Sequence, residues 1–329
     1  MSNLLAGRFD GDLSGVALIV GVSGQTGSYL ARRLVGRGLK VVGTTRDDDP
    51  RNLWRLEKLG VLGQVDIELM SPSDFGSVFS VLDKLRPESA FFLGGQSSVG
   101  LSFHQPSEAL ESIAHAVQNI LEALRLLELD TKFVNSASTD MFGNQPGVLL
   151  DEMSPMRPVS PYGVAKLASF GLTVQYREAF KKWCSNAILS NHESPLRGAG
   201  FVSSKIVSEL EKLREGEVDT LKFGNLSVVR DWLWADDVAS ALLAIAELPR
   251  PDDFVVGSGD SHSLKELIFA TGEAFDIDTN HFLQSDASLL RPNEIESVYL
   301  NTKKLRNATG WVPEVSFREI ASRLARRAI

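Results

Sequence analysis

Cysteine is nearly absent from this sequence, since Cys184 is the only one in 329 residues. A single cysteine forms no internal disulfide, and it excludes a metal site built from a cysteine cluster. No apolar run approaches the length of about 18 residues that a membrane helix requires. The N-terminal segment MSNLLAGRFDGDL lacks the basic head and the long apolar stretch of a secretory signal. We therefore expect a cytoplasmic protein that does not contact a membrane.

An excess of positive charge is also missing. The chain has 34 lysines and arginines against 42 aspartates and glutamates, which gives a net charge of −8. Nucleic acid is therefore not expected as a partner, because binding to its phosphates needs a basic surface. The five histidines do not follow the spacing of metal ligands, so no metal site is expected. The hydrophobic share of 43% and the charged share of 23% are ordinary for a globular protein. The length indicates about two domains or one large α/β unit.

Short apolar runs alternate with helical patterns through the first half of the chain. Residues 16–20 have the unbroken hydrophobicity of a buried strand, and residues 25–37 follow with apolar side chains on one helical face. The further predicted strands are residues 39–42, 65–69, 90–93, 132–134 and 186–189, and the further predicted helices are residues 106–127 and 161–181. This alternation predicts βαβ units, and hence an α/β fold with a doubly wound parallel sheet of the Rossmann type.

A glycine-rich turn directly follows the first predicted strand and opens the first predicted helix. Its three glycines have the spacing GxxGxxG: one allows a tight turn, one lets the backbone approach a pyrophosphate, and one permits close packing of the helix on the sheet. The free N–H groups at the start of the helix then face the anion. We expect a dinucleotide-binding turn formed by Gly21, Ser23, Gly24, Gln25, Thr26 and Gly27. The alternative is a glycine-rich turn with a purely structural role.

The regular alternation of strands and helices ends near residue 190. Shorter elements and prolines follow, which indicates a less regular unit. We predict a dinucleotide-binding domain over residues 14–190 and a smaller C-terminal substrate-binding part over residues 191–222 and 249–329. Residues 223–248 are predicted to complete the first domain, because residues 232–247 again have a helical pattern.

The end of the second strand distinguishes the two nicotinamide dinucleotides. An acidic side chain there favours the ribose diol of NAD, and a basic one favours the 2′-phosphate of NADP. Arg46 stands at this end, whereas Asp47, Asp48 and Asp49 follow it and oppose a phosphate. We expect Arg46 to bind the cofactor and NADP to be preferred, with NAD kept as the alternative.

Tyr162 and Lys166 form a YxxxK motif on the predicted helix 161–181. The spacing i, i+4 places the phenol and the ammonium on one face, and a nearby cation lowers the pKa of a tyrosine, which suits general acid–base catalysis. Ser136 and Ser138 follow the fifth predicted strand, and hydroxyls at the carboxyl end of a parallel strand point into the ligand crevice. The alternatives are a surface pair for the motif and turn capping for the serines.

Together these motifs resemble the extended short-chain dehydrogenase/reductase superfamily. Longer segments narrow the resemblance to the GDP-mannose 4,6-dehydratase family, namely QSSVG at 96–100, SPYGVAKL at 160–167, NHESPLRG at 191–198, RDW at 230–232 and RPNE at 291–294. The resemblance implies a nucleotide-sugar 4,6-dehydratase. Such an enzyme would convert GDP-mannose or a close GDP-linked sugar to its 4-keto-6-deoxy form and would recycle its NADP, or NAD, internally.

The resemblance implies catalytic roles for Ser138, Asp140, Tyr162 and Lys166. Tyr162 would take the proton of the C4 hydroxyl while hydride passes to the nicotinamide, Lys166 would hold the ribose, and Ser138 would bond the C4 oxygen. A carboxylate would then remove the C5 proton, water would leave from C6, and the hydride would return to C6. The family has a glutamate where Asp140 stands, so the expected base is shorter by about 1.5 Å. The alternative for Asp140 is an aspartate that only caps a turn.

The resemblance also implies ligand contacts. The implied cofactor residues, besides the glycine-rich turn and Arg46, are Tyr162, Lys166, Asn191, His192 and Arg197. The implied residues around the nucleotide sugar are Ser97, Val99, Asn191, Val202, Lys205, Arg230, Arg291 and Glu294. Arginine offers phosphate a bidentate fork, although Arg230 could instead pair with Asp231 inside the protein. The family further implies a homodimer or a homotetramer.

Two departures from the family pattern concern the cofactor. The family has an aspartate in the turn where Thr26 stands, and another at the end of the third strand where this chain has Leu69. Two other functions therefore stay open. A reductase or epimerase of a GDP-4-keto-6-deoxy sugar would keep Tyr162 and Lys166 but needs no base at position 140. A catalytically inactive cofactor-binding regulator would need only the glycine-rich turn.

Overall fold

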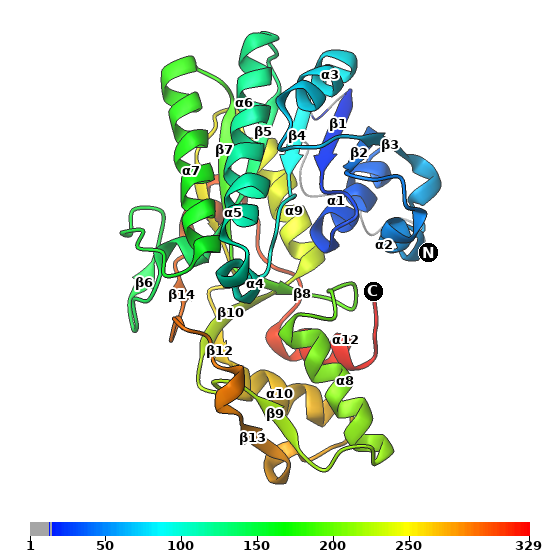
Figure 1. The fold of residues 1–329 in the computed structure, drawn as a ribbon, viewed down its shortest axis with the longest axis vertical. Helices are drawn as coiled ribbons and strands as arrows, with labels where there is room; N and C mark the ends of the chain where they lie inside the picture. Colours follow the sequence, from blue (N-terminus) through cyan, green and yellow to red (C-terminus); the bar gives the residue numbers. More distant parts are fainter. Residues whose placement is uncertain (1–12, 14) are drawn as a thin grey trace.

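A sheet of seven strands forms the centre of the computed structural model, which describes residue 13 and residues 15–329 (Figure 1). The strand order is β11-β7-β5-β4-β1-β2-β3, and every neighbouring pair is parallel. The strands are β1 (Val16–Val20), β2 (Lys40–Thr45), β3 (Val65–Leu69), β4 (Ser89–Phe92), β5 (Lys132–Ser138), β7 (Cys184–Leu189) and β11 (Asp253–Val256). The order reverses between β1 and β4, and doubly wound sheets bind their ligands at such a switch point.

Helices cover both faces of this sheet. Ile19 and Phe91 face one helical layer, whereas Leu18 and Phe92 face the other, because successive side chains of a strand point to opposite sides. The first layer contains α1 (Gln25–Gly36) and α9 (Ala235–Ala246), and the second contains α3 (Phe75–Leu85), α6 (Ala116–Leu126) and α7 (Pro161–Phe180). Burial on both faces explains why the strands are hydrophobic without interruption. The predicted α/β class and doubly wound parallel sheet are confirmed.

Two elements differ in detail from their predicted form. The sequence predicts one continuous helix over residues 106–127. In the structure, α5 (Pro106–Ala109) passes into a π-helical turn over residues 110–115 before α6 begins. Strand β5 is longer than predicted, because its last residues continue to pair with β7 as far as Ser138 and Leu189. Ser136 and Ser138 therefore lie within the strand end rather than after it.

The chain passes between the sheet and a smaller part more than once. Helix α9 lies in the segment 223–248 and packs against α1, where Arg33 pairs with Asp236 at 2.7 Å. The position of strand β11 differs from the prediction, which places residues 249–329 in the smaller part. It pairs with β7 instead and forms an edge of the large sheet, where Phe254 and Val255 are buried.

The smaller part has its own hydrophobic core and lies below the sheet in Figure 1. Its elements are α8 (Val202–Glu215), β9 (Leu221–Phe223), β10 (Val229–Trp234), β12 (Ser261–Ser263), α10 (Leu264–Ala274), β13 (Leu283–Ser285) and α12 (Phe317–Ala325). Ile206, Ile268 and Leu324 join α8, α10 and α12 in this core. Strand β8 (Asn191–Glu193) directly follows β7 and pairs in parallel with β10, so it connects the sheet to the smaller part.

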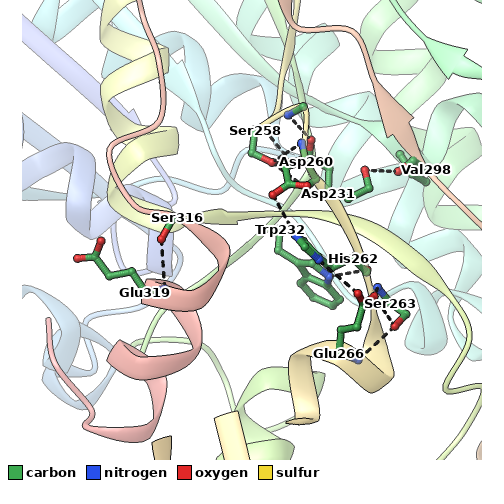
Figure 2. A network of polar contacts seen from close by, with 12 residues as sticks. Asp231, Trp232, Ser258, Asp260, His262, Ser263, Glu266, Val298, Ser316 and Glu319 are labelled. Carbon is green, nitrogen blue, oxygen red and sulfur yellow. Dashed lines mark hydrogen bonds and ion pairs between the residues drawn. The ribbon is translucent and has the colours of Figure 1, made fainter. Parts of the chain in front are cut away.

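A polar network holds β10 in position (Figure 2). The Asp231 carboxylate accepts hydrogen bonds from the backbone N–H and the hydroxyl of Ser258, at 2.8 and 3.0 Å. The indole N–H of Trp232 donates to the carbonyl oxygen of His262 at 2.9 Å. Because His262 is also the register partner of Arg230, these contacts fix the strand from which Arg230 projects.

Two features are absent from the described residues, namely a helix that could span a membrane and a cluster of metal-binding side chains. None of their helices is both long and apolar enough to span a bilayer. Within the same range, no group of three or more His, Cys, Asp or Glu side chains is arranged to hold a metal ion. Residues 1–12 of the segment considered for a signal, and residue 14 at which the first domain is predicted to begin, lie outside the described residues.

Candidate active site

Two adjoining clefts open at the carboxyl edge of the large sheet. The inner cleft has a volume of about 350 Å³, and the glycine-rich turn and the ends of β4, β5 and β7 line it. The outer cleft, of about 1090 Å³, lies toward α8 and the smaller part. The residues that line both clefts are Arg55, Asn191, Arg197, Gly198, Gly200, Phe201, Val202, Arg230 and Arg291.

The glycine-rich turn has the geometry of an anion-binding turn. Gly21 has a φ of +92°, and a Cβ there would lie 2.9 Å from the backbone of Gly94. A Cβ on Gly27 would overlap the carbonyl oxygen of Gly21, so the helix could not approach the strand so closely. Helix α1 begins without a side-chain cap and without an acidic residue in its first turn. The N–H groups of Gln25 and Thr26, which precede the first helical hydrogen bond, are therefore available to an anion in the inner cleft.

Thr26 is paired with His192 across the inner cleft. The Thr26 Oγ1 lies 2.9 Å from Nε2 of His192, whose Nδ1 lies 2.8 Å from the carbonyl oxygen of Ser190. A carbonyl only accepts, so Nδ1 carries the proton and Nε2 accepts from the Thr26 hydroxyl. Burial and, to a smaller extent, the Arg197 guanidinium lower the pKa of His192 to about 3, so the imidazole is neutral at pH 7. Gln25 adds a second connection, since its side-chain amide donates to the carbonyl oxygen of His192 at 3.1 Å.

Ser138, Asp140 and Tyr162 form a chain of polar contacts in the inner cleft. The Ser138 hydroxyl donates to Oδ2 of Asp140 at 3.2 Å and accepts from the backbone N–H of Asp140 at 3.2 Å. The Tyr162 phenol lies close enough to Ser138 for this hydroxyl to lower the pKa of the phenol. Lys166 lies on the same side of α7 and donates to the carbonyl oxygen of Ser136 at 2.5 Å. The structure thus brings the four predicted catalytic side chains to one side of the cleft.

The start of α7 explains how Tyr162 reaches Asp140. The Ser160 hydroxyl accepts from the backbone N–H of Gly163 at 3.1 Å, and Pro161 is the first helical residue, so the helix begins at a defined point. A Cβ on Gly163 would lie 2.9 Å from the carbonyl oxygen of Asp140. Glycine at this position therefore lets the first turn of α7 pack against the segment that carries Asp140.

The protonation of Tyr162 differs from the prediction. Burial raises the pKa of Tyr162 above its ordinary value, the Asp140 carboxylate raises it further, and Ser138 and Arg197 oppose this increase. The Nζ of Lys166 lies 5.8 Å from the centre of the phenol ring and donates to a backbone carbonyl instead. The predicted lowering of the Tyr162 pKa by Lys166 is therefore wrong for this arrangement, because desolvation is the larger effect. Burial also lowers the pKa of Lys166 to about 8, which leaves its ammonium largely charged at pH 7.

Arg230, Arg291 and Glu294 meet where the two clefts join. Oε1 of Glu294 lies 3.2 Å from Nη2 of Arg230 and 3.5 Å from Nη1 of Arg291. Arg230 is only 9% exposed. Its alternative pairing with Asp231 does not occur among the described residues, because the Asp231 carboxylate is bound within the network of Figure 2. Two guanidinium groups held by one carboxylate can offer their remaining donors to phosphate.

The other predicted ligand residues divide between the clefts. Ser97 and Val99 line the inner cleft, Asn191 and Val202 line both, and Lys205 lines the outer cleft. Lys205 also lies above the ring of Phe223, with Nζ 4.9 Å from its centre. These side chains come from the segment that follows β4, from β8 and from α8, which the fold brings to the same edge of the sheet.

Arg46 lies apart from the other predicted cofactor residues. Its side chain is 75% exposed, and its ion-pair partner is Glu108 at 3.8 Å. It is absent from the described lining of both clefts, as are Gly21 and Ser23. Ser23 instead offers its carbonyl oxygen to Arg55, at 2.9 Å.

Arg55 is a site residue that sequence reasoning missed. It lies on the short helix α2 (Trp54–Lys58) and lines both clefts. Its hydrogen-bond acceptors are Ser23 and Leu196, which lie 32 and 141 positions away in the sequence. No local pattern could have indicated these contacts.

Residues 18–324 match the family model for GDP-mannose 4,6 dehydratase. This chain belongs to the GDP-mannose 4,6-dehydratase family. GDP-mannose 4,6 dehydratase 1 of Arabidopsis thaliana is 33% identical over 315 residues, which cover 93% of this chain and 87% of that protein. GDP-mannose 4,6 dehydratase of Homo sapiens is 30% identical over 343 residues, which cover 95% of this chain and 92% of that protein. The predicted family and enzyme class are confirmed: the chain is a hydro-lyase of the NAD(P)-dependent short-chain dehydrogenase/reductase superfamily.

Solved structures agree with this membership at the level of the fold. A dTDP-glucose 4,6-dehydratase of Streptomyces venezuelae superposes with a TM-score of 0.82 at 19% identity, over 95% of this chain and 96% of that chain. A UDP-glucose 4-epimerase of Thermotoga maritima also reaches 0.82, at 22% identity, over 95% of this chain and 98% of that chain. This chain thus shares its fold with both of these proteins.

Proposed function

We propose that this chain converts GDP-mannose, or a close GDP-linked sugar, to the 4-keto-6-deoxy sugar by 4,6-dehydration. The observation that carries this proposal is the inner cleft. There Ser138, Asp140, Tyr162 and Lys166 lie with the glycine-rich turn around one volume of about 350 Å³. Relatives of similar length that are named GDP-mannose 4,6 dehydratase support the same reaction.

A dinucleotide fits the residues of the inner cleft. The close backbone approach at Gly21, the uncapped start of α1 and the neutral Thr26–His192 pair leave the N–H donors free of competing negative charge. The bound cofactor supplies a hydride acceptor that later returns the hydride, and its oxidised ring supplies a positive charge that lowers the pKa of a neighbouring phenol. We propose NADP as the cofactor, with NAD as the alternative; a related fold was solved with NADPH.

The catalytic side chains then divide the proton transfers. Tyr162 takes the proton of the C4 hydroxyl as the hydride leaves C4, and Ser138 holds the C4 oxygen through its hydroxyl. The resulting C4 ketone acidifies the C5 proton. Asp140 removes that proton, and the C6 hydroxyl leaves as water with a proton from solvent, which replaces the one that Tyr162 took. C6 would receive the hydride back from the bound cofactor, and Asp140 returns a proton to C5. Atoms and electrons balance, because the sugar loses one water and no net oxidation occurs.

The nucleotide end of the substrate is proposed to occupy the outer cleft. Arg230 and Arg291 stand where the clefts join and would contact the diphosphate, while Lys205 and Val202 lie farther toward α8. Glu294 holds both guanidinium groups and can accept from a ribose diol. With this orientation the sugar extends from the diphosphate into the inner cleft toward Tyr162.

We also propose a cytoplasmic location and a homodimer or homotetramer. The cytoplasmic location is supported by the single buried cysteine, since the chain has no internal disulfide to protect. Self-association is supported by exposed apolar side chains between α4 (Val99–His104) and the end of α7, namely Leu101, Leu110, Val164 and Phe180. Size-exclusion chromatography with light scattering tests the oligomeric state.

The reaction is tested by proton NMR of the purified protein with GDP-mannose in D₂O. One tube contains no added cofactor, and a second contains catalytic NADP⁺. We expect a C6 methyl signal to grow in and deuterium to appear at C5, since the proton that Asp140 returns exchanges with solvent.

The other outcomes separate the alternatives. A spectrum unchanged in both tubes refutes the dehydratase for this sugar, and the 4-keto-6-deoxy sugar with NADPH then tests a reductase. A methyl signal without deuterium at C5 would contradict the role of Asp140 as an exchangeable base.

A further inference from the structure

Arg55 joins two segments that belong to different parts of the molecule. Its Nη1 donates to the carbonyl oxygen of Ser23 in the glycine-rich turn at 2.9 Å, and its Nε donates to the carbonyl oxygen of Leu196 at 2.7 Å. The guanidinium lies over the ring of Trp54, with Cζ 4.4 Å from the ring centre. One planar group therefore sets the spacing between the turn and the segment 194–201.

The position of Arg55 between the clefts is unusual. Of the residues that line both clefts, Arg55 alone comes from the described residues before 190; all the others belong to residues 191–291. The segment it holds continues into Arg197 and Phe201, which line both clefts, and then into α8. Arg55 thereby connects the turn beside the inner cleft, through the carbonyl oxygen of Ser23, to a segment that forms a wall of the outer cleft.

The charge of Arg55 is not neutralised by a carboxylate. Among the described residues it forms no ion pair, and its hydrogen-bond acceptors are both backbone carbonyls. Burial lowers the pKa of Arg55, and the positive charge of Arg197 lowers it further. Uncompensated positive charge at the junction of the clefts favours the simultaneous presence of two anionic ligands.

We propose that Arg55 is a positioning residue that couples the two clefts, so that a dinucleotide on the glycine-rich turn strengthens the binding of a nucleoside diphosphate in the outer cleft. The inference rests on the proposed function, which assigns one ligand to each cleft. Each ligand alone must fix the segment 194–201 through its own contacts. When one ligand is already bound, its contacts, carried through Arg55, have fixed this segment, and the second ligand therefore binds more tightly.

The test uses isothermal titration calorimetry of the full chain with NADP⁺ and GDP as probes. The dissociation constant of GDP is measured without and with saturating NADP⁺, and their ratio is the coupling factor. We expect a factor of at least about five in the unchanged protein, and the same factor for the effect of GDP on NADP⁺, because coupling is reciprocal.

Three variants isolate the bridge. Arg55→Met keeps the stem that packs on Trp54 but removes both donors, and Arg55→Lys keeps the charge but has one ammonium that cannot hold both carbonyls. Both are expected to bring the coupling factor to about one or below, since two anions then only repel. Arg51→Met is the matched control, because Arg51 is exposed, forms an ion pair with Asp49 and lines neither cleft. It should keep the factor of the unchanged protein.

Thermal unfolding is measured for each variant. If Arg55 had a merely structural role, its replacement would lower the stability and weaken the binding of both ligands, but the coupling factor would not change. An unchanged ratio in Arg55→Met, or full coupling in Arg55→Lys, would overturn the inference. A ratio of about one in the unchanged protein would overturn it as well. If neither probe bound the unchanged protein, the proposed function itself would be refuted, which the single-ligand titrations show directly.

Discussion

Asp140→Asn removes one charge from the inner cleft and leaves its shape nearly intact. The asparagine can still contact the Ser138 hydroxyl, which lies 3.2 Å from Oδ2 in the unchanged protein. The variant can no longer take the C5 proton, and loss of a general base typically costs about 10²–10⁴-fold, or about 3–5 kcal/mol of transition-state stabilisation. The carboxylate also raises the pKa of Tyr162, so its removal lowers that pKa and does not hinder the oxidation at C4.

The two half-reactions are therefore expected to respond in opposite ways. In a single turnover with NADP⁺, the absorbance of the reduced nicotinamide should form at or above the rate of the unchanged protein and then persist. Deuterium incorporation at C5 and the C6 methyl signal should fall by at least about 10²-fold. Stopped-flow absorbance measures the first step and NMR in D₂O the second.

Asp140→Glu is the matched control, because it keeps the charge and lengthens the side chain. A displacement of about 1 Å costs up to about 10²-fold, so this variant should retain measurable exchange at C5 where Asp140→Asn does not. Exchange at C5 that survived in Asp140→Asn near the parent rate would refute the assignment of Asp140 as the base. Equal loss of both half-reactions would instead show that Asp140 acts on the oxidation of C4.

Three further predictions concern the neighbouring groups. Tyr162→Phe should slow reduction of the cofactor in the single turnover by about 10²–10⁴-fold without weakening the binding of GDP. A rate equal to that of the unchanged protein would exclude Tyr162 as the acid–base group. The pKa of His192 is about 3 in the fold against an ordinary value of 6.5, so the unfolded chain binds more protons between these values. The contribution of His192 to the free energy of unfolding is therefore fully present above about pH 6.5 and is lost as the pH drops toward 3, by at most about 5 kcal/mol. His192→Asn should flatten this part of the profile in urea unfolding, and an unchanged slope would contradict the buried neutral imidazole. Arg230→Met should destabilise the protein by about 1.5–3 kcal/mol, because Glu294 loses its closer partner but keeps Arg291. Arg230→Met combined with Glu294→Gln should recover stability in the same unfolding assay but not the KM of the nucleotide sugar; recovery of both would make Arg230 purely structural.

Local patterns predicted the frame of the site well. The strand at 16–20 and the glycines of the turn are neighbours in sequence, and the spacing of Tyr162 and Lys166 is a single helical turn. Such features depend on a few consecutive residues, so they survive any change elsewhere in the chain. The alternation of strands and helices predicted six of the seven strands and the doubly wound class of the sheet.

Long-range contacts could not be predicted in the same way. The pairing of Thr26 with His192 joins residues 166 positions apart, and the bridge from Arg55 to Leu196 spans 141. Strand β11 was placed in the smaller part because its proline-rich surroundings look irregular, yet it forms an edge of the large sheet. None of these three contacts is indicated by the residues next to it in the sequence.

The sequence by itself determined which side chains are available for chemistry and in which order the chain presents them. The tertiary structure decided their protonation and their distances. Lys166 follows Tyr162 by one helical turn in any model of the helix, but only packing buries the phenol beside Asp140 and turns the ammonium toward the Ser136 carbonyl. Burial is a property of the whole fold, because the atoms that exclude water come from segments far apart in the chain. The direction of the Tyr162 pKa shift is therefore fixed by the packed structure rather than by the motif.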